Sequence, residues 1–317
     1  MEVGIGVDMG GTRVKIGLVG EGKLLADATI PASAHGKLTD RLIEIGDKVD
    51  ELLKDLKAQP TGIGIALPSI VDHVRSKVLS KYVKYPDAQD VDFDKWAMQR
   101  WKIPVALEND AKAALVGEWQ YGNGKGCRDL VLITLGTGVG SAVMMDGKLL
   151  SGRNFVAGNL GGHMTINVNG KECNCGNIGC LETESSTWTL RDDVTSSAGF
   201  AASALSKEKE IDFKILFQLA AQGDHLAIQV RDKCLKAWSL GVISLIHAFD
   251  PERIVVGGGI MMSGDLVLSH ISEMIRKHSW VKDNPPELIS AAHPDFAGIL
   301  GMYYLLANSK KVYKSVL

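Results

Sequence analysis

The sequence predicts a two-lobed α/β protein. Its 317 residues, 45% hydrophobic and 23% charged, are more than one compact domain usually holds. Residues 3–19 are typical of strand, glycine turn and strand, because β-branched and apolar segments flank the sequence DMGGT. Residues 130–145 repeat this plan around LGTGVG. Two copies of one β-ribbon, about 130 residues apart, indicate two related lobes that face one cleft.

The other segments alternate between helical and strand patterns, as an α/β fold requires. An apolar stripe with charges opposite predicts a helix over residues 41–56. The further predicted elements are a strand at 62–67, a helix near 92–101, a strand ending at Glu108, a helix over 111–119, helices at 212–222 and about 224–248, a strand from Arg253, and helices near 264–277 and 296–307. A turn at Asp146-Gly147 predicts a hairpin after the second ribbon.

Composition and charge favour small-molecule partners. A net charge of -2 and a pI near 6.5 leave no excess of positive charge for the phosphates of a duplex, so we expect no nucleic-acid binding. The longest uncharged stretch, residues 130–145, is shorter than the ~20 apolar residues of a membrane span. The N-terminus lacks the features of a secretory signal. We therefore expect a cytoplasmic protein without membrane contact.

The turn of the first ribbon is suited to binding phosphate. Gly10 and Gly11 let phosphate oxygens approach backbone N–H groups, Thr12 follows them, and Lys15 lies just downstream. Asp8 can hold Mg²⁺ through water. The alternative is a glycine hairpin in which Asp8 is only a turn residue.

Two further glycine turns complete a candidate nucleotide site. Gly136, Thr137 and Gly138 form the matching turn of the second ribbon, where the Thr137 hydroxyl can bind phosphate. Gly258 and Gly259 follow a buried strand and precede a helix, so a flat adenine or ribose can lie against the backbone there. Either turn alone is weak evidence, since such turns often contain glycine without a ligand. Phosphate turns at equivalent places in two repeats are much harder to explain by chance.

The segment Glu108-Asn109-Asp110-Ala111 places a carboxylate between the end of a strand and the first turn of a helix. Phosphoryl transfer to an alcohol needs a base within hydrogen-bond reach of the attacking hydroxyl. Asp110 is the candidate for this general base. Without the phosphate turns a helix N-cap is the better explanation, because Asp and Asn both favour that position.

One histidine and three cysteines form the most specific pattern in the chain. His163, Cys173, Cys175 and Cys180 offer an imidazole and three thiolates, which is a complete tetrahedral set for structural zinc. Four protein ligands leave no open coordination position, so this zinc would shape the site rather than activate water. Glu182 follows the last cysteine by two residues and would be held rigidly. The alternative is three free cysteines in a turn.

Together these motifs resemble the ROK family (repressors, open reading frames and sugar kinases) of the actin-like hexokinase superfamily. The resemblance covers almost the entire chain, through DMGGT, ENDA, LGTGVG, CNCGNIGCLE and VVGGGI. It implies an actin-like, ribonuclease H-like α/β fold. One lobe would hold residues 1–112 and a C-terminal helix at about 296–317, and the larger lobe would hold residues 113–295 with the zinc loop. We also expect a homodimer.

The resemblance implies ATP-dependent phosphorylation of a hexose or hexose derivative at a sugar hydroxyl. Asp110 would take the hydroxyl proton, and Asn109, His163 and Glu182 would bind the sugar. His163 would reach the sugar with one ring nitrogen while the other binds zinc. The two phosphate turns would surround Mg²⁺ and the ATP phosphates, and the third glycine turn would approach the adenosine.

One position departs from the family pattern. Family kinases usually carry a glutamate three residues before the zinc histidine, where this chain has Leu160, or Asn159 if one glycine is inserted. Neither side chain fully replaces a carboxylate that accepts hydrogen bonds from sugar hydroxyls. We therefore expect Asn159 to bind the sugar and plain glucose not to be the preferred substrate.

Two other functions are known within the family. A transcriptional repressor would carry an N-terminal helix-turn-helix, which we do not expect because the first phosphate strand starts at residue 3. A non-catalytic sugar-binding regulator would have a damaged DxGGT motif or would lack the ENDA aspartate. Both are intact here, so we favour the kinase.

Overall fold

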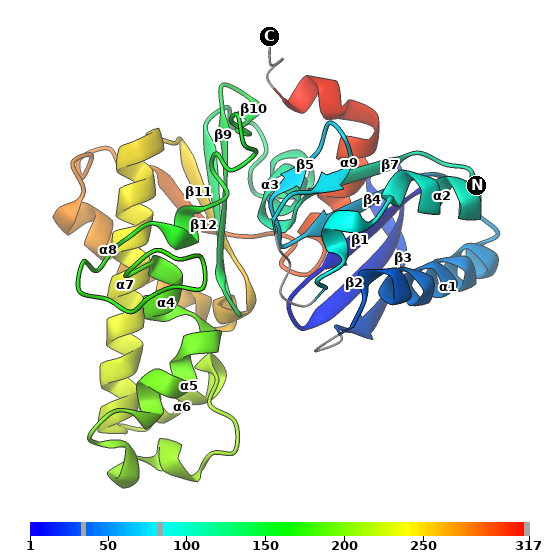
Figure 1. The fold of residues 1–317 in the computed structure, drawn as a ribbon. Coiled ribbons are helices and arrows are strands. Elements are labelled where there is room, and N and C mark those ends of the chain that lie inside the picture. The colour runs from blue at the N-terminus through cyan, green and yellow to red at the C-terminus, as the bar shows by residue number, and fades with distance from the viewer. Residues whose placement is uncertain (33–35, 81–84, 314–317) are drawn as a thin grey trace. The chain divides into compact units, whose positions relative to one another are not determined.

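The computed structural model describes residues 1–32, 36–80 and 85–313, which group into two compact units (Figure 1). The first unit comprises Met1–Arg128, Ala142–Asn159 and Ala292–Leu317, and the second comprises Asp129–Ser141 and Leu160–Ala291. The domain bounds expected from the sequence stay a prediction, with one lobe of residues 1–112 and 296–317 and a second of residues 113–295. Residues 314–317, the end of the predicted C-terminal helix, lie outside the described residues.

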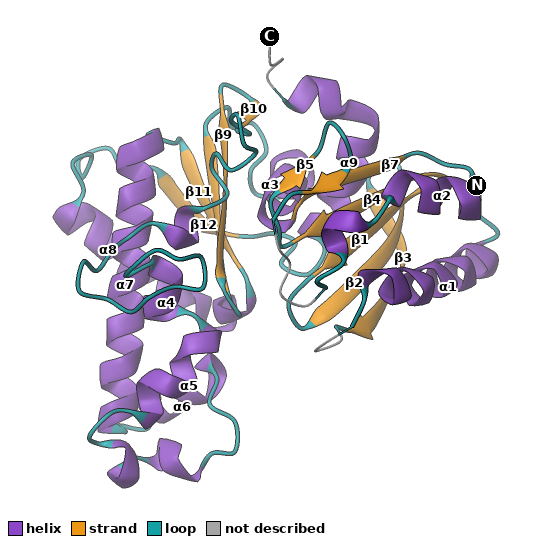
Figure 2. Cartoon of the chain, viewed as in Figure 1, coloured by secondary structure: helices purple, strands orange, loops and turns teal. Residues whose placement is uncertain are grey.

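The first unit contains a five-stranded mixed sheet in the order β3-β2-β1-β4-β7 (Figure 2). Its strands are β1 (Glu2–Met9), β2 (Arg13–Gly20), β3 (Lys23–Pro31), β4 (Gln59–Leu67) and β7 (Val105–Asn109). The ribbon β1–β2–β3 is antiparallel, whereas β1, β4 and β7 run parallel. The unit also has α1 (Leu38–Leu56), α2 (Phe93–Trp101), α3 (Asp110–Tyr121), α9 (Ala297–Val312), a 3-10 turn at Ala88–Asp90 and the short strands β5 (Val71–Asp72), β6 (Lys77–Val78) and β10 (Lys148–Leu149).

Alternation along β1 and β4 decides how helices pack on this sheet. The apolar positions of both strands join the α1 stripe in one buried core, because successive side chains of a strand point to opposite faces. The other face carries glycines. A Cβ on Gly6 would lie 2.7 Å from Ile299, and one on Gly64 would lie 2.7 Å from Met302. Helix α9 therefore packs directly against the strand backbone, on the face of the sheet opposite α1 (Figure 1).

The second sheet is mixed, because β8, β11 and β12 run parallel whereas β9 and β10 pair antiparallel. It has the order β10-β9-β8-β11-β12, with β8 (Leu130–Leu135), β9 (Val139–Met145), β11 (Arg253–Gly257) and β12 (Glu287–Ser290). Strands β8, β11 and β12 belong to the second unit. The boundary between the units falls within β9. The helices are α4 (Leu181–Ser185), α5 (Thr187–Thr195), α6 (Phe213–Ala221), α7 (His225–Phe249) and α8 (Gly264–His278), with 3-10 turns at Gly161–His163, Phe200–Ala202, Ala204–Lys207 and Gly259–Ser263.

The predicted α/β class, both ribbons and all the predicted helices are confirmed, with ends shifted by a few residues. Strands β3 and β12 and helices α4 and α5 were not predicted. Strand β3 lies at the sheet edge, where none of its residues is fully buried, so it lacks the apolar run that marks a buried strand. The α4–α5 sequence is polar and shows no helical stripe. Among the described residues, no helix is both long and apolar enough to cross a membrane.

Candidate active site and metal centre

The first predicted phosphate turn joins β1 to β2 and places two charged side chains together. Asp8 near the end of β1 is the register partner of Lys15 on β2. Lys15 Nζ donates to Asp295 Oδ1 at 2.8 Å and to the Asp295 carbonyl at 3.0 Å. Burial and the charge of Asp110 raise the pKa of Asp8 to about 7, although Lys15 opposes this shift. Asp8 and Asp110 are thus close enough to repel each other, an arrangement that a cation would stabilise.

The turn from β7 into α3 fixes the two residues of the ENDA segment. Asn109 is the N-cap of α3, because its Oδ1 accepts the N–H of Lys112 at 3.2 Å. Its Nδ2 donates to the Ser69 carbonyl at 3.3 Å and to Asp110 Oδ1 at 3.1 Å. Asp110 Oδ1 also accepts the N–H of Ala111 at 2.8 Å. The N-cap role therefore falls to Asn109, and the Asp110 carboxylate lies on the first helical turn, where the positive end of the helix dipole favours its charge.

A buried polar network lies directly behind this turn, and sequence reasoning missed it. Glu108, 1% exposed, accepts the N–H of Asn109 on Oε1 at 2.7 Å and the hydroxyl of Tyr313 on Oε2. His73 stacks on the Tyr313 ring at 3.7 Å between centroids. Burial raises the pKa of Glu108, and the fully buried Lys112 opposes this shift. Burial and the Lys112 charge lower the pKa of His73 to about 4, so this imidazole is neutral near pH 7.

In the second unit the glycine turn contacts the predicted sugar ligand Glu182. The turn is closed by the N–H of Gly136, which donates to the Gly138 carbonyl at 3.0 Å. Glu182 Oε2 accepts the N–H of Val139 at 2.8 Å. A Cβ on Gly138 would lie 2.5 Å from the same oxygen, so any other residue there would displace the carboxylate. The structure thus brings together two predicted elements, the phosphate turn around Thr137 and Glu182.

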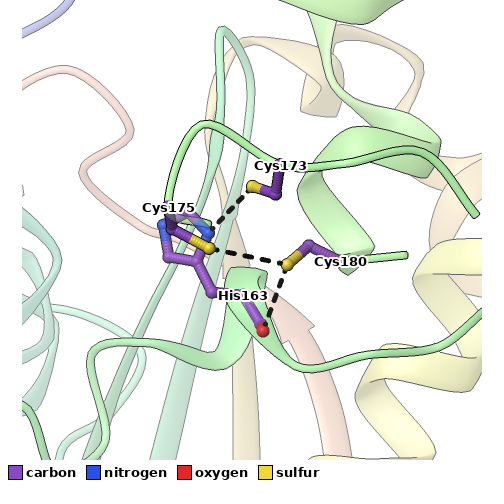
Figure 3. Close-up of side chains that lie close together, drawn as sticks. All are labelled: His163, Cys173, Cys175 and Cys180. Atoms are coloured by element: carbon purple, nitrogen blue, oxygen red, sulfur yellow. Dashed lines mark hydrogen bonds between the residues drawn. The ribbon is translucent and has the colours of Figure 1, made fainter. Parts of the chain in front are cut away.

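The predicted zinc ligands lie together in one loop of the second unit (Figure 3). The ligand atoms of His163, Cys173, Cys175 and Cys180 all lie within 4.8 Å of one another. His163 Nδ1 is 3.6 Å from Cys173 Sγ, and Cys175 Sγ is 3.8 Å from Cys180 Sγ. A tetrahedral ion with Zn–S bonds of about 2.3 Å would hold sulfur atoms about 3.8 Å apart. The donor set and its spacing therefore fit zinc, with Nδ1 of His163 on the metal side.

Electrostatics and backbone support the same conclusion about this cluster. Burial and the neighbouring thiols raise the pKa of Cys180 to about 12. Three crowded thiols thus disfavour the thiolate form, and a bound cation would restore it. Gly179 has a φ of 62°, and a Cβ there would lie 1.6 Å from the Asn167 carbonyl oxygen. The loop is therefore folded tightly around the four ligands and delivers Glu182 at the start of α4.

The third glycine turn lines a hollow in the second unit. Gly258 has a φ of 93°, and a Cβ there would lie 2.2 Å from the Leu135 carbonyl oxygen, so only glycine fits. The next residue, Gly259, lines a hollow of about 780 Å³ whose walls also include Phe213 and Ser290. This volume is within the range of small-molecule sites.

The two residues that could stand in place of the family glutamate, Leu160 and Asn159, differ sharply in solvent exposure. Leu160 is 38% exposed, whereas Asn159 is 8% exposed. The Asn159 Nδ2 donates to the Phe155 carbonyl at 3.4 Å, and its Oδ1 has no hydrogen-bond partner among the described residues. A buried acceptor without a donor is costly, so a ligand donor at this oxygen would stabilise it.

Comparison with known proteins places this arrangement in a family. Residues 4–309 match the ROK family. Over 306 residues, the chain is 33% identical to a glucokinase of Thermotoga maritima, which covers 94% of this chain and 95% of that protein. The chain therefore belongs to the ROK family.

Solved structures of the family include an enzyme and a regulator. The fold is similar to that of a ROK family glucokinase from Streptomyces griseus in complex with glucose and AMPPNP, with a TM-score of 0.77, 29% identity, and coverage of 96% of this chain and 98% of that one. It is also similar to a ROK family transcriptional regulator, a homolog of the E. coli MLC protein, with a TM-score of 0.82, 27% identity, and coverage of 96% and 78%. Function within the family must therefore be argued from the site.

Proposed function

We propose that this protein is an ATP-dependent sugar kinase in which Asp110 is the general base. The observation that carries the proposal is the β7–α3 turn, where the amide of Asn109 and the N–H of Ala111 both hold one oxygen of Asp110. A base held in this way needs little reorganisation to accept a proton. The similarity to glucokinases supports a hexose or a hexose derivative as the acceptor.

The chemistry assigns each group a simple task. The sugar hydroxyl oxygen forms a bond to the γ-phosphorus while the bond from that phosphorus to the β-bridging oxygen of ATP breaks. The hydroxyl proton passes to Asp110. The glycine turns 10–12 and 136–138 would donate backbone N–H groups to the phosphates, with Thr12, Thr137 and Lys15 beside them, and Gly258 and Gly259 would contact adenosine.

Asp8 is proposed to bind the Mg²⁺ that arrives with ATP. Its pKa near 7 means that the carboxyl group is partly protonated at neutral pH without a cation. Asp8 would hold a magnesium ion in its ionised form, and the ion would supply positive charge between Asp8 and Asp110. Asp110 would then be the carboxylate that receives the proton.

The sugar is proposed to be bound by Asn109, Asn159, His163 and Glu182. Zinc, when bound, would supply a structural cross-link and no catalytic chemistry, because four protein ligands fill its coordination sphere. The chain's own contribution is to hold Glu182 at the start of α4 and to leave the second nitrogen of His163 for the sugar. We keep the predicted homodimer and cytoplasmic location as part of this proposal.

The test is ATP consumption across a panel of hexoses by the wild type and by Asp110→Asn. We expect the variant to lose at least ~10²-fold in kcat, as is typical for loss of a general base, with fold and metal content unchanged. Asp250→Asn is the matched control, because Asp250 caps α7 with a φ of 44°, a conformation that asparagine tolerates. Sugar binding by the wild type without turnover of any sugar would instead identify a non-catalytic regulator.

A further inference from the structure

Trp188 lies beside Glu182 without being part of the apolar core. It is the second residue of α5, and its side chain is 43% exposed. The indole Nε1 donates to Glu182 Oε1 at 3.1 Å. The backbone N–H of Trp188 donates to the Thr137 carbonyl at 3.3 Å. One residue is therefore bonded both to the phosphate turn and to the predicted sugar ligand.

Glu182 is held from two sides as a result. Its Oε2 accepts the N–H of Val139, and its Oε1 accepts the indole of Trp188. These two donors act on different oxygens, so together they fix the plane of the carboxylate. An ionised carboxylate has about four acceptor positions, and an indole offers a donor and no acceptor. The arrangement thus orients the group and leaves acceptor capacity for the hydroxyls of a ligand.

The start of α5 is itself tied to the phosphate turn. The N–H and the hydroxyl of Thr187 both donate to the Gly136 carbonyl, at 3.1 and 2.9 Å. The position of the indole is therefore set by the backbone of the turn. By contrast, the fully buried Trp238 donates to the Ser185 carbonyl and serves the core. Burial explains the position of Trp238 and does not explain that of the partly exposed Trp188.

We propose that Trp188 is a positioning residue that sets the orientation of the Glu182 carboxylate and through it the affinity for sugar. The inference rests on the proposed function, because it takes Glu182 as a sugar ligand. Trp188→Phe keeps an aromatic ring, and removes the N–H donor to Glu182 together with part of the ring area. We expect the dissociation constant and the KM for sugar to rise about tenfold, with kcat, the KM for ATP and the zinc content changed less than about twofold.

The experiment combines calorimetric binding with steady-state kinetics. Glucose, mannose and N-acetylmannosamine are titrated into the wild type, Trp188→Phe, Glu182→Gln and the double variant. If the indole acts through Glu182, Trp188→Phe adds little in the Glu182→Gln background. Trp280→Phe is the matched control, because Trp280 is 91% exposed and its backbone N–H donates to His247, away from Glu182; we expect wild-type values.

Three results would overturn the inference. The first is wild-type sugar affinity in Trp188→Phe, which would show that the hydrogen bond is idle. The second is an equal loss in both backgrounds, which would show that the indole acts directly on the ligand. The third is failure of all three sugars to bind the wild type. Failure of the proposed kinase function has a different signature, since sugar would then bind with Trp188-dependent affinity while no ATP is consumed.

Discussion

The contact between Tyr313 and Glu108 allows a sharp test of how the turn from β7 into α3 is supported. The hydroxyl of Tyr313, near the C-terminus, donates to the carboxylate of Glu108, which is 1% exposed and precedes Asn109 in β7. Tyr313→Phe removes this donor and keeps the ring that stacks on His73. The substitution therefore leaves a buried carboxylate with one hydrogen bond fewer and almost the same packing.

The cost follows from the charge and burial of Glu108. Hydrogen bonds to charged groups contribute about 1.5–3 kcal/mol, so we expect the free energy of unfolding to fall by about 2 kcal/mol at pH 8. Burial raises the pKa of Glu108, and the Tyr313 hydroxyl lowers it. A raised pKa in the folded state means that stability from this group is present below the ordinary pKa and is lost as the pH rises through the raised value. Without Tyr313 that loss grows, so the variant is destabilised less at pH 5 than at pH 8.

Urea unfolding at pH 5 and pH 8 measures both quantities. Tyr304→Phe is the control, because Tyr304 lies on α9, the helix that Tyr313 caps, and its ring packs edge-on against Trp119 and Tyr121. We expect Tyr304→Phe to lower the free energy of unfolding by less than about 0.5 kcal/mol, as for most substitutions away from buried polar contacts. Equal stability of Tyr313→Phe and wild type at pH 8, or a larger loss at pH 5, would refute the reasoning.

Three further predictions concern the candidate site. The pKa of Asp8 is raised to about 7, so ionisation of this group lowers the stability of the folded protein as the pH rises from about 4 to 7. At pH 8, Asp8→Asn should therefore unfold at a higher urea concentration than the wild type while losing kinase activity. A lower urea midpoint for the variant would contradict this. Elemental analysis should find one zinc per chain, lost in Cys175→Ser together with sugar affinity and kept in Cys127→Ser; zinc-free protein with full activity would refute the assignment. The last prediction concerns kcat/KM across glucose, mannose, allose, fructose, N-acetylglucosamine and N-acetylmannosamine. We expect a sugar other than glucose to have the highest kcat/KM, and we expect Asn159→Ala to lower that value. The expectation is wrong if glucose leads about tenfold, which corresponds to about 1.4 kcal/mol in transition-state binding, and Asn159→Ala has no effect.

Local sequence predicted the ribbons and the metal loop because their information is local. Two β-branched segments around a glycine turn are enough to predict a ribbon, and a histidine followed by three crowded cysteines is enough to predict a tetrahedral site. The two-lobed α/β class followed from chain length and the repeated ribbon, the actin-like type followed from the resemblance to the ROK family, and the apolar stripe predicted the helix over residues 41–56. The spacing of the sulfur and nitrogen atoms in the structure agrees with that expectation.

The polar network behind the turn from β7 into α3 could not be predicted in this way. Tyr313 and Glu108 are 205 residues apart in the sequence, and His73 comes from the β5–β6 region. No local sequence pattern links these three residues. The contact exists because α9 packs closely on the glycine face of β1 and β4, which carries the C-terminal segment back toward β7. The glycine alternation was visible in the sequence, but it specifies close packing without saying which helix packs.

One extra glycine before His163 makes it ambiguous in the sequence whether Leu160 or Asn159 stands in place of the family's sugar-binding glutamate. Gly162 cannot be replaced, because a Cβ there would lie 1.8 Å from the Val139 carbonyl oxygen, and one on Gly161 would lie 2.6 Å from Ser141 Oγ. Both glycines are therefore required by packing, which favours an insertion over a substituted glutamate. Asn159 would then be the polar side chain at this position, and its buried Oδ1 has no hydrogen-bond partner within the part of the chain that the structure describes. Asparagine keeps an acceptor for a sugar hydroxyl but lacks the charge that strengthens such a hydrogen bond about twofold. We therefore expect this chain to differ from the glucokinases it resembles in sugar selectivity rather than in reaction type.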